Sequence, residues 1–324
     1  MSSLRAGVLG VGHLGAAHAR LLSQRPGFEL VGIHDRDAER ASFVAAEIGA
    51  RAYTDPGRLL GNIDAAIIAV PTGAHYELGR MALKSGCHVL LEKPLATDLT
   101  EANELVRLAE EEERVLAVGH IERFNGVLLA VEDCLQQPRF IESLRMAPFQ
   151  NRGTDVTVIL DLMIHDIDLV LALANSPLTD VHAVGVPVLS PSIDIANARL
   201  VFESGTVANI TASRISIKPL RHLRLFQDNG YFSLNLATGV GEHYRRRNAL
   251  NVQEIKGIES VVERLPVHAV KGEPLARELD AFAEAISGNP SRLVLGPAGR
   301  DALATAIRIT SEIEESMNVL TQDS

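Results

Sequence analysis

The stretch that decides the fold is Arg5–Gly15 (RAGVLGVGHLG), in which three spaced glycines follow a short apolar run. The run Ala6–Leu9 has the character of a strand, and the residues from His13 to Gln24 have helical spacing. Glycines at a strand-to-helix turn allow a tight bend, a close approach of the backbone to a ligand, and close helix–strand packing. Because a helix N-terminus also favours anions, the pattern is typical of a turn that binds the pyrophosphate of a dinucleotide.

An acidic residue after the next apolar run supports this interpretation. Phe28–His34 is predicted to be the second strand of a βαβ unit, and Asp35 follows it directly. A carboxylate there accepts a hydrogen bond from a ribose 2′-hydroxyl and repels a 2′-phosphate, which favours NAD. Arg36 could pair with such a phosphate, so NADP stays an alternative. The candidate cofactor contacts in this unit are Gly10, Gly12, His13, Leu14, Gly15, Asp35 and Arg36.

The first third of the chain alternates apolar strands with amphipathic helices. After the opening unit the expected elements are helices at 38–48, 74–85 and 99–113 and strands at 51–53, 64–70, 88–91 and 114–119. Buried strands separated by helices predict a doubly wound parallel sheet with helices on both faces. Ligands bind beyond the carboxyl ends of such strands, so we expect the functional residues directly after them.

The pattern changes near residues 120–125. A helix is expected at 126–137, a strand at 140–147 and a strongly apolar helix at 157–174. Strands follow at 181–189, 196–202, 206–213, 222–228 and 231–236, and helices at 273–286 and 297–317 end the chain. Successive strands with short turns predict a large, mostly antiparallel sheet. We therefore expect an α/β chain with a nucleotide-binding domain at 1–121 and a second domain at 122–324, from which a terminal helix could pack back on the first.

The composition fits an enzyme and excludes other classes. The 324 residues are 46% hydrophobic and 22% charged, and the net charge of −10 argues against a nucleic-acid partner. No apolar run reaches the ~18 residues that cross a bilayer, and no leader pattern opens the chain. Cys87 and Cys134 make no disulfide framework, so we expect a cytoplasmic protein without a membrane partner.

Two groups of residues beyond strand ends could carry chemistry. Lys93 follows a predicted strand and precedes Pro94, a rigid place from which an ammonium group can enter the crevice. Asp161, His165 and Asp168 (DLMIHDID) would share one face of a regular helix. Polar groups in so apolar a helix need partners, and a structural network, a metal site and an acid–base pair all fit the spacing.

The motifs resemble those of the glucose–fructose oxidoreductase and inositol dehydrogenase family over nearly the whole chain. The resemblance rests on the glycine fingerprint, Val70-Pro71-Thr72 with His75, Glu92-Lys93-Pro94 and Asp161-x-x-x-His165. It implies a Rossmann domain joined to an α/β domain whose open sheet makes the interface of a homodimer or homotetramer. It also implies that Lys93, Asp161 and His165 are catalytic. We expect no metal. Pro71, Thr72, His75, Glu92 and Lys93 would then line the cofactor site.

A narrower resemblance, to family members that oxidise the 3-hydroxyl of UDP-N-acetylglucosamine, rests on the segment 118–125 (VGHIERFN) and on residues 158–168 and 213–216. Gly126 departs from that pattern, which has proline there. The candidate substrate contacts are His120, Arg123, Asn125, Arg152 and His165, with Arg214 also available for a diphosphate. The alternatives are a dehydrogenase of a free polyol, inositol or aldose and a sensor that binds a dinucleotide without turnover.

Overall fold

The chain consists of two compact units. The computed structural model describes residues 3–149, 156–247, 257 and 261–322. One unit contains Met1–Phe124 with Glu273–Leu303, and the other contains Asn125–Gly272 with Ala304–Ser324. The division thus differs from a single cut after residue 121, because the segment Glu273–Leu303 returns to the first unit.

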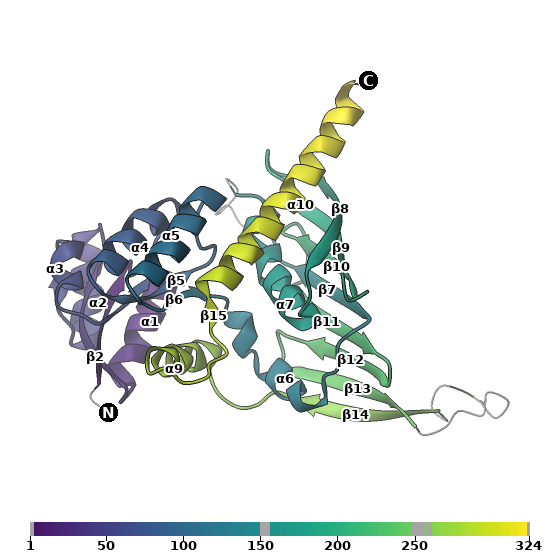
Figure 1. Cartoon of the computed structure of the whole chain (residues 1–324), viewed down its shortest axis with the longest axis horizontal. Coiled ribbons are helices and arrows are strands. Elements are labelled where there is room, and N and C mark those ends of the chain that lie inside the picture. Colours follow the sequence, from purple (N-terminus) through teal and green to yellow (C-terminus); the bar gives the residue numbers. More distant parts are fainter. Residues whose placement is uncertain (1–2, 150–155, 248–256, 258–260, 323–324) are drawn as a thin grey trace. The chain divides into compact units, whose positions relative to one another are not determined.

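The first unit is built on a seven-stranded sheet (Figure 1). Its strands, in spatial order, are β15 (Val294–Leu295), β6 (Leu116–Gly119), β5 (His88–Glu92), β4 (Ala65–Ile68), β1 (Leu4–Leu9), β2 (Phe28–His34) and β3 (Ala52–Tyr53). The pairs from β6 to β3 are parallel, as predicted, and the short edge strand β15, which the sequence did not reveal, runs antiparallel to β6. The order reverses beside β1, which places the glycine turn at the switch point where ligands bind in such sheets.

Helices cover both faces of this sheet. They are α1 (His13–Gln24), α2 (Ala38–Ile48), α3 (Pro56–Leu60), α4 (His75–Lys84), α5 (Leu99–Glu111) and α9 (Pro274–Ile286). On one face α1, α2 and α9 share a core, in which Leu22, Val44 and Phe282 pack with Val8 and Ile67 of the strands. The other helices pack on the opposite face and against each other. Helix α9, from the last fifth of the chain, thereby completes the nucleotide-binding unit.

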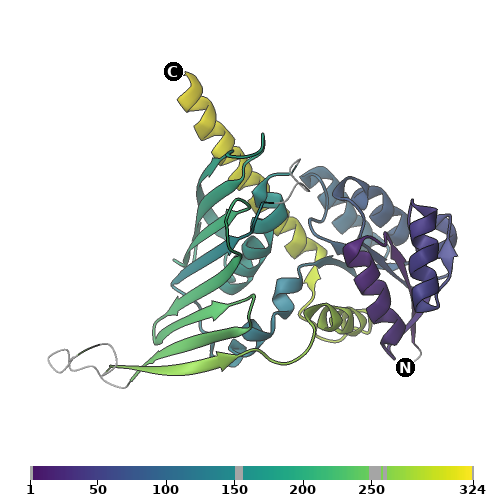
Figure 2. The ribbon, with the colours of Figure 1, turned by 180° about the vertical axis from the view of Figure 1, so that it is seen from behind.

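The second unit has an eight-stranded sheet, seen from behind in Figure 2. Its strands, in spatial order, are β14 (Val262–His268), β13 (Val240–Arg246), β12 (Gly230–Asn235), β11 (Leu220–Gln227), β7 (Phe140–Met146), β10 (Val207–Ser213), β9 (Ile195–Phe202) and β8 (Leu178–Val186). Only the pair β7–β10 of these is parallel, so the predicted mostly antiparallel sheet is confirmed. The last two strands of this sheet in chain order, β13 and β14, were not predicted.

One face of the second sheet is covered and the other is open. Side chains alternate along β7, where the buried ones face α7 (Ile164–Ala174) and the half-buried ones form the open face. The later part of α10 (Gly296–Gln322) packs on β8, where Ile313 lies beside Gly185. The open face carries a row of rings in contact from four strands: Phe226, Tyr231 and Tyr244 are stacked, and Phe140 is tilted against Phe226.

Two expected helices of the second unit differ from prediction. The helix expected at 126–137 shortens to α6 (Gly126–Leu129) and a single 3₁₀ turn, Glu132–Cys134. The helix expected at 157–174 opens with a π-helical turn, Ile159–Met163, before α7 begins. Apolar periodicity does not reveal either change, because both segments keep their buried residues.

Among the residues that the structure describes, no helix combines the length and the apolar character that a bilayer crossing demands.

Candidate functional site

The glycine turn has the shape that a dinucleotide phosphate needs. Gly10 has φ +84°, and a Cβ there would lie 2.5 Å from the Ala69 carbonyl oxygen. A Cβ on Gly15 would lie 1.8 Å from the carbonyl oxygen of Gly10, so only glycine allows helix α1 to start so close to β1. A Cβ on Gly12 would meet no atom within 4 Å, which leaves the backbone open to a ligand. No side chain caps the N-terminus of α1, so its N–H groups are available to phosphate oxygens.

Asp35 is tied to the same turn. Its Oδ2 accepts a hydrogen bond of 2.7 Å from the backbone N–H of Val11, and its Oδ1 accepts one of 3.0 Å from Asp37. Arg40, which the sequence analysis did not single out, donates from Nε to the Val11 carbonyl at 2.6 Å. The half-buried carboxylate thus sits beside the turn, in the place expected for a ribose contact. Arg36 beside it is exposed, as are His13 and Leu14.

The buried ring of His75 lies between two loops. Its Nδ1 lies 2.8 Å from the Pro94 carbonyl oxygen, and its Nε2 lies 2.9 Å from that of Val70. Burial lowers the pKa of His75, and a neutral ring donates through one nitrogen only. His75 therefore donates a hydrogen bond to one of these two loops, which carry Pro71–Thr72 and Lys93, and its role as a cofactor contact stays a prediction.

Glu92 is the last residue of strand β5, and Lys93 follows it directly. Glu92 accepts a hydrogen bond at Oε1 from Nε2 of the buried His18, which lies 3.0 Å away on α1. The side chain of Lys93 is half-buried. His18 was missed by the sequence analysis, although a histidine on the apolar face of α1 is a signal that could have found it.

Asp161, His165 and Asp168 are not on one regular helix. Asp161 lies in the π turn, His165 is near the start of α7, and Asp168 is buried farther along. In a π turn the hydrogen bonds run from i to i+5, and such turns occur often at functional sites. The expectation of a simple i, i+4, i+7 face is therefore wrong, because the π turn rotates Asp161 relative to the residues of α7.

Lys93 belongs to the first unit, whereas Asp161 and His165 belong to the second. Their convergence on one substrate atom stays a prediction.

A buried ion pair anchors α7 next to His165. Asp166 accepts from Nε of Arg145 at 2.5 Å and from the Ser143 hydroxyl at 2.7 Å, and all three side chains are buried. The bidentate arginine fixes the rotation of α7 on β7, so the neighbouring His165 has a defined direction. The sequence analysis missed this pair, since the acid lies in an apolar run and its partner is on a strand.

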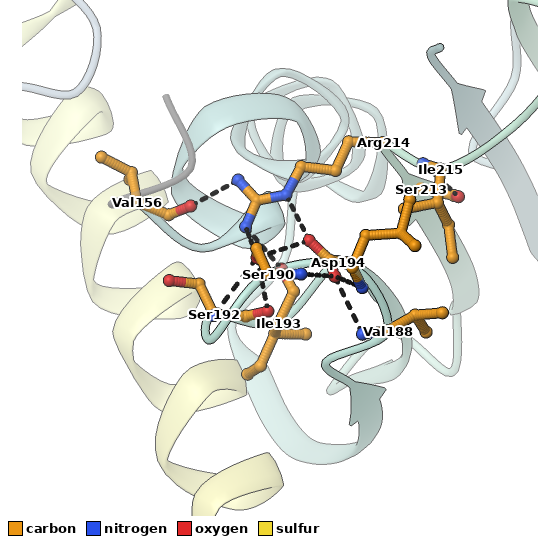
Figure 3. A network of polar contacts seen from close by, with 10 residues as sticks. Val156, Val188, Ser190, Ser192, Ile193, Asp194, Ser213, Arg214 and Ile215 are labelled. Carbon is orange, nitrogen blue, oxygen red and sulfur yellow. Dashed lines mark hydrogen bonds and ion pairs between the residues drawn. The ribbon is translucent and has the colours of Figure 1, made fainter. Parts of the chain in front are cut away.

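Arg214 is not available for a diphosphate, which corrects the sequence-based expectation. It is buried, and its Nε donates to Oδ1 of Asp194 at 2.8 Å (Figure 3). Its two terminal nitrogens donate to the carbonyl oxygens of Val156 at 2.6 Å and Ile193 at 3.3 Å. Arg214 therefore links the loop after β8 to Val156, which lies three residues before the π turn.

Asp194 is the centre of this network. Its Oδ2 accepts from the backbone N–H groups of Val188, Leu189 and Ser190 at 2.6–2.9 Å. Burial by itself would raise the pKa of Asp194, but the hydrogen bonds from Ser190, Leu189 and Arg214 together outweigh it and hold that pKa far below its usual value. The loop from 188 to 194 is thus folded around one buried, ionised carboxylate.

Three further candidate substrate contacts, His120, Arg123 and Asn125, follow strand β6 in the sequence. His120 is buried and Arg123 is half-buried. Asn125 caps α6 by accepting from Val127 N–H, and its Nδ2 donates to the Leu236 carbonyl at 2.9 Å. Arg152 lies outside the described residues. Gly126 stands where the resembled pattern has proline. A Cβ there would lie 2.5 Å from the Val270 carbonyl oxygen, so the backbone around Val270 lies too close to residue 126 for a side chain.

Within the described residues no group of three or more His, Cys, Asp or Glu side chains is arranged to hold a metal ion.

Comparison with known proteins connects this geometry to a family. Residues 4–120 match a family model described as an oxidoreductase family with an NAD-binding Rossmann fold, and residues 129–233 match the GFO/IDH/MocA C-terminal domain. The chain is 38% identical to UDP-N-acetylglucosamine 3-dehydrogenase of Acidithiobacillus ferrooxidans, over 97% of this chain and 98% of that protein. The solved structure of that enzyme superimposes with a TM-score of 0.88, at 37% identity, covering 97% of this chain and 99% of the other. A scyllo-inositol 2-dehydrogenase of Bacillus subtilis is 28% identical over 66% of this chain and 68% of its own length.

Proposed function

Since the chain belongs to the GFO/IDH/MocA family of oxidoreductases, whose first domain is an NAD-binding Rossmann fold, we propose that it oxidises the 3-hydroxyl of UDP-N-acetylglucosamine to a ketone. The observation that carries this proposal is the 38% identity, over 97% of the chain, to an enzyme of that name. The coarser statement, that the chain is an NAD-dependent oxidoreductase, follows from the family itself.

The residues of the glycine turn fit NAD. The open backbone at Gly12 and the uncapped start of α1 would hold the pyrophosphate, and Asp35 would accept from the adenosine ribose. When bound, NAD supplies the acceptor for the hydride that leaves the sugar carbon. The chain itself has to position the alcohol and remove its proton.

We propose that His165 is the general base that removes the proton of the substrate hydroxyl. A neutral imidazole can take the hydroxyl proton, and Asp161 would orient the ring and stabilise the imidazolium. Lys93 would stabilise the negative charge that develops on the same oxygen. Support for these roles comes from the setting of each group: the buried ring of His75 lies against the loop of Lys93, and the Arg145–Asp166 pair fixes the helix of His165.

His120, Arg123 and Asn125 are proposed to contact the substrate, with Arg152 as a further candidate in the part of the chain that is not described. An arginine can pair with the diphosphate of a nucleotide sugar, a group that a free sugar lacks. We also propose that the enzyme assembles as a homodimer or homotetramer through the open face of the second sheet. A cytoplasmic location is proposed from the free thiols of Cys87 and Cys134.

A substrate panel tests the proposal. The enzyme is mixed with NAD and either UDP-N-acetylglucosamine, UDP-glucose, N-acetylglucosamine, scyllo-inositol or myo-inositol, and NADH formation is followed by absorbance. We expect turnover with UDP-N-acetylglucosamine and at least about tenfold lower kcat/KM for the free sugars, which lack the diphosphate contacts. Turnover of inositols alone would support the free-polyol alternative, and NAD binding without turnover of any sugar would support a sensor.

A further inference from the structure

Both backbone polar groups of Val11, the residue between Gly10 and Gly12, are bound by side chains. The N–H of Val11 donates to Oδ2 of Asp35 at 2.7 Å, and its carbonyl oxygen accepts from Nε of Arg40 at 2.6 Å. The side chain of Val11 is fully buried in the core that α1 and α2 share. Val11 is therefore held at three points, through its side chain and through the peptide unit on each side of it.

The two partners of Val11 come from one short segment that local hydrogen bonds hold in shape. The backbone N–H of Asp37 donates to Oδ1 of Asp35 at 3.0 Å. Asp37 in turn caps α2, and its Oδ1 accepts from the backbone N–H of Arg40 at 3.1 Å. The segment that leads into α2 thus places one acceptor and one donor against the same residue of the glycine turn.

The hydrogen bond to Asp35 fixes the first of two peptide units. In a planar trans peptide the carbonyl and the N–H point in opposite directions. Asp35 binds the N–H of the unit that joins Gly10 to Val11, so the Gly10 carbonyl points away from Asp35. That oxygen lies 1.8 Å from where a Cβ of Gly15 would be. Asp35 thus helps to set the close contact between the turn and α1.

The hydrogen bond to Arg40 fixes the second unit, which joins Val11 to Gly12. Because Arg40 holds the Val11 carbonyl, the N–H of Gly12 points away from Arg40. A Cβ on Gly12 would meet no atom within 4 Å, and no side chain caps the start of α1. The N–H of Gly12 thus belongs to the open end of this helix, where anions bind.

A peptide unit that ends at a glycine can change its orientation easily. Glycine adopts positive and negative φ, so the unit between Val11 and Gly12 can turn over at little cost. The turned-over unit would present the Val11 carbonyl oxygen to the phosphates, and two negative groups would face each other. The hydrogen bond from Arg40 favours the orientation that offers the N–H to an anion.

We propose that Arg40 is a positioning residue for the cofactor: its hydrogen bond to the Val11 carbonyl keeps the N–H of Gly12 directed at the pyrophosphate of NAD. The inference rests on the proposed place of the pyrophosphate at this turn. Because Arg40 acts through the peptide unit in this role, its hydrogen-bond donor matters and its positive charge does not.

Two variants separate the hydrogen bond from the charge. In Arg40→Gln, Nε2 stands at the same position along the side chain as Nε of arginine, so the donor is kept and the charge is lost. In Arg40→Met a methyl group takes that position, and the donor and the charge are both lost. Arg58→Met, at an exposed arginine of α3, removes a charge from the same unit and is the control.

NAD affinity, measured by isothermal titration, is the main readout. We expect Arg40→Met to weaken NAD binding about five- to tenfold, the effect of one hydrogen bond, and Arg40→Gln and Arg58→Met to stay within about twofold of wild type. At saturating NAD the kcat of Arg40→Met should equal that of wild type, with only KM for NAD raised. Wild-type affinity in Arg40→Met, or equal losses in the Gln and Met variants, would overturn the inference.

A double-mutant cycle tests whether Arg40 acts through Gly12. In Gly12→Ala, whose methyl group already fills the space of the pyrophosphate, adding Arg40→Met should weaken NAD binding by less than about twofold. Effects that multiply would mean that Arg40 acts elsewhere, which contradicts the proposal. Denaturant unfolding without NAD is the check on folding. A lower unfolding midpoint with wild-type NAD affinity would assign Arg40 to stability alone and end the proposal as well.

This inference and the proposed function fail separately. The expected NAD affinities without turnover of any sugar would overturn the proposed function and leave the role of Arg40 standing. Turnover of UDP-N-acetylglucosamine by wild type, with NAD affinity unchanged in Arg40→Met, would overturn the role of Arg40 and leave the function standing.

Discussion

At the scale of single residues, Gly12 and Gly15 of the same turn lack a side chain for different reasons. Gly15 is required by packing, because any Cβ would collide with the carbonyl oxygen of Gly10. Gly12 is not required by packing, because the space beside it is open. The two positions therefore test different properties of the same turn.

We expect Gly12→Ala to leave the free energy of unfolding nearly unchanged and to weaken NAD binding at least about tenfold, because the methyl group fills the space of the pyrophosphate. Gly15→Ala should weaken binding and also destabilise the protein by about 1–3 kcal/mol, since α1 has to shift. Isothermal titration with NAD and denaturant unfolding measure the two effects. Wild-type NAD affinity in Gly12→Ala would contradict the assigned pyrophosphate position.

Lys93 is the residue on which the proposed chemistry depends most. We expect Lys93→Met to bind NAD normally and to lose about 10² or more in kcat, the size of one electrostatic or acid–base contribution. Lys84→Met, at an exposed lysine of α4, is the matched control and should keep full activity. Near-native turnover of the Lys93 variant would remove this residue from the catalytic set.

At the scale of elements, the loop between β8 and β9 is held by charge more than by apolar burial. Val188 and Leu189 are exposed, while the polar side chains of Asp194 and Arg214 are inside. The loop therefore depends on the ion pair and its backbone donors. Removing one partner leaves a buried charge without compensation.

We expect Arg214→Met to lower the free energy of unfolding by about 3–5 kcal/mol, and Asp194→Asn combined with it to recover part of that loss. The sign of the pH dependence follows from the depressed pKa of Asp194. Its contribution is complete above about pH 4, the unfolded pKa, and is lost as the pH falls towards the folded pKa. Denaturant unfolding of wild type and Asp194→Asn between neutral and acidic pH measures this contribution. If the free energy of unfolding falls equally with pH in both proteins, the role assigned to Asp194 is contradicted.

At the scale of the whole molecule, the open face of the second sheet is the face that the described helices of the second unit leave uncovered. Leu144 lies on it, between Thr211 and His222 of the neighbouring strands, and the row of four rings extends the apolar area. A second copy covering this face would shield apolar side chains that are half-buried in the single chain.

We expect Leu144→Glu to shift the protein from a dimer or tetramer to a monomer in sedimentation velocity, because the charge would be buried in the interface. NAD affinity should not change, since the nucleotide-binding residues lie in the other unit. Phe43→Glu, at a side chain 72% exposed on α2, is the control and should keep the wild-type sedimentation. A monomeric wild type would contradict the proposed assembly.

Much of the fold could be predicted from periodicity, and less of the site. The bounds of α1, β2 and α2 agree with prediction, because local spacing and glycine or aspartate signals define them. The strands β13 and β14 were missed, since β-structure in a charged sequence depends on pairing with distant strands. Arg214 was misassigned because its partner Asp194 is twenty residues away in the chain and was not singled out.

The sequence by itself determined the nucleotide-binding turn and the alternation of strands and helices, because these depend on residues close to one another in the chain, and its motifs indicated the family. Tertiary structure alone decided that His75 is buried between two loops, that Arg214 is internal and that α9 brings a buried acid to the first unit. The physical reason is the same in each case. A polar side chain is a ligand contact or a structural partner depending on which groups surround it, and those groups come from segments that only folding brings together.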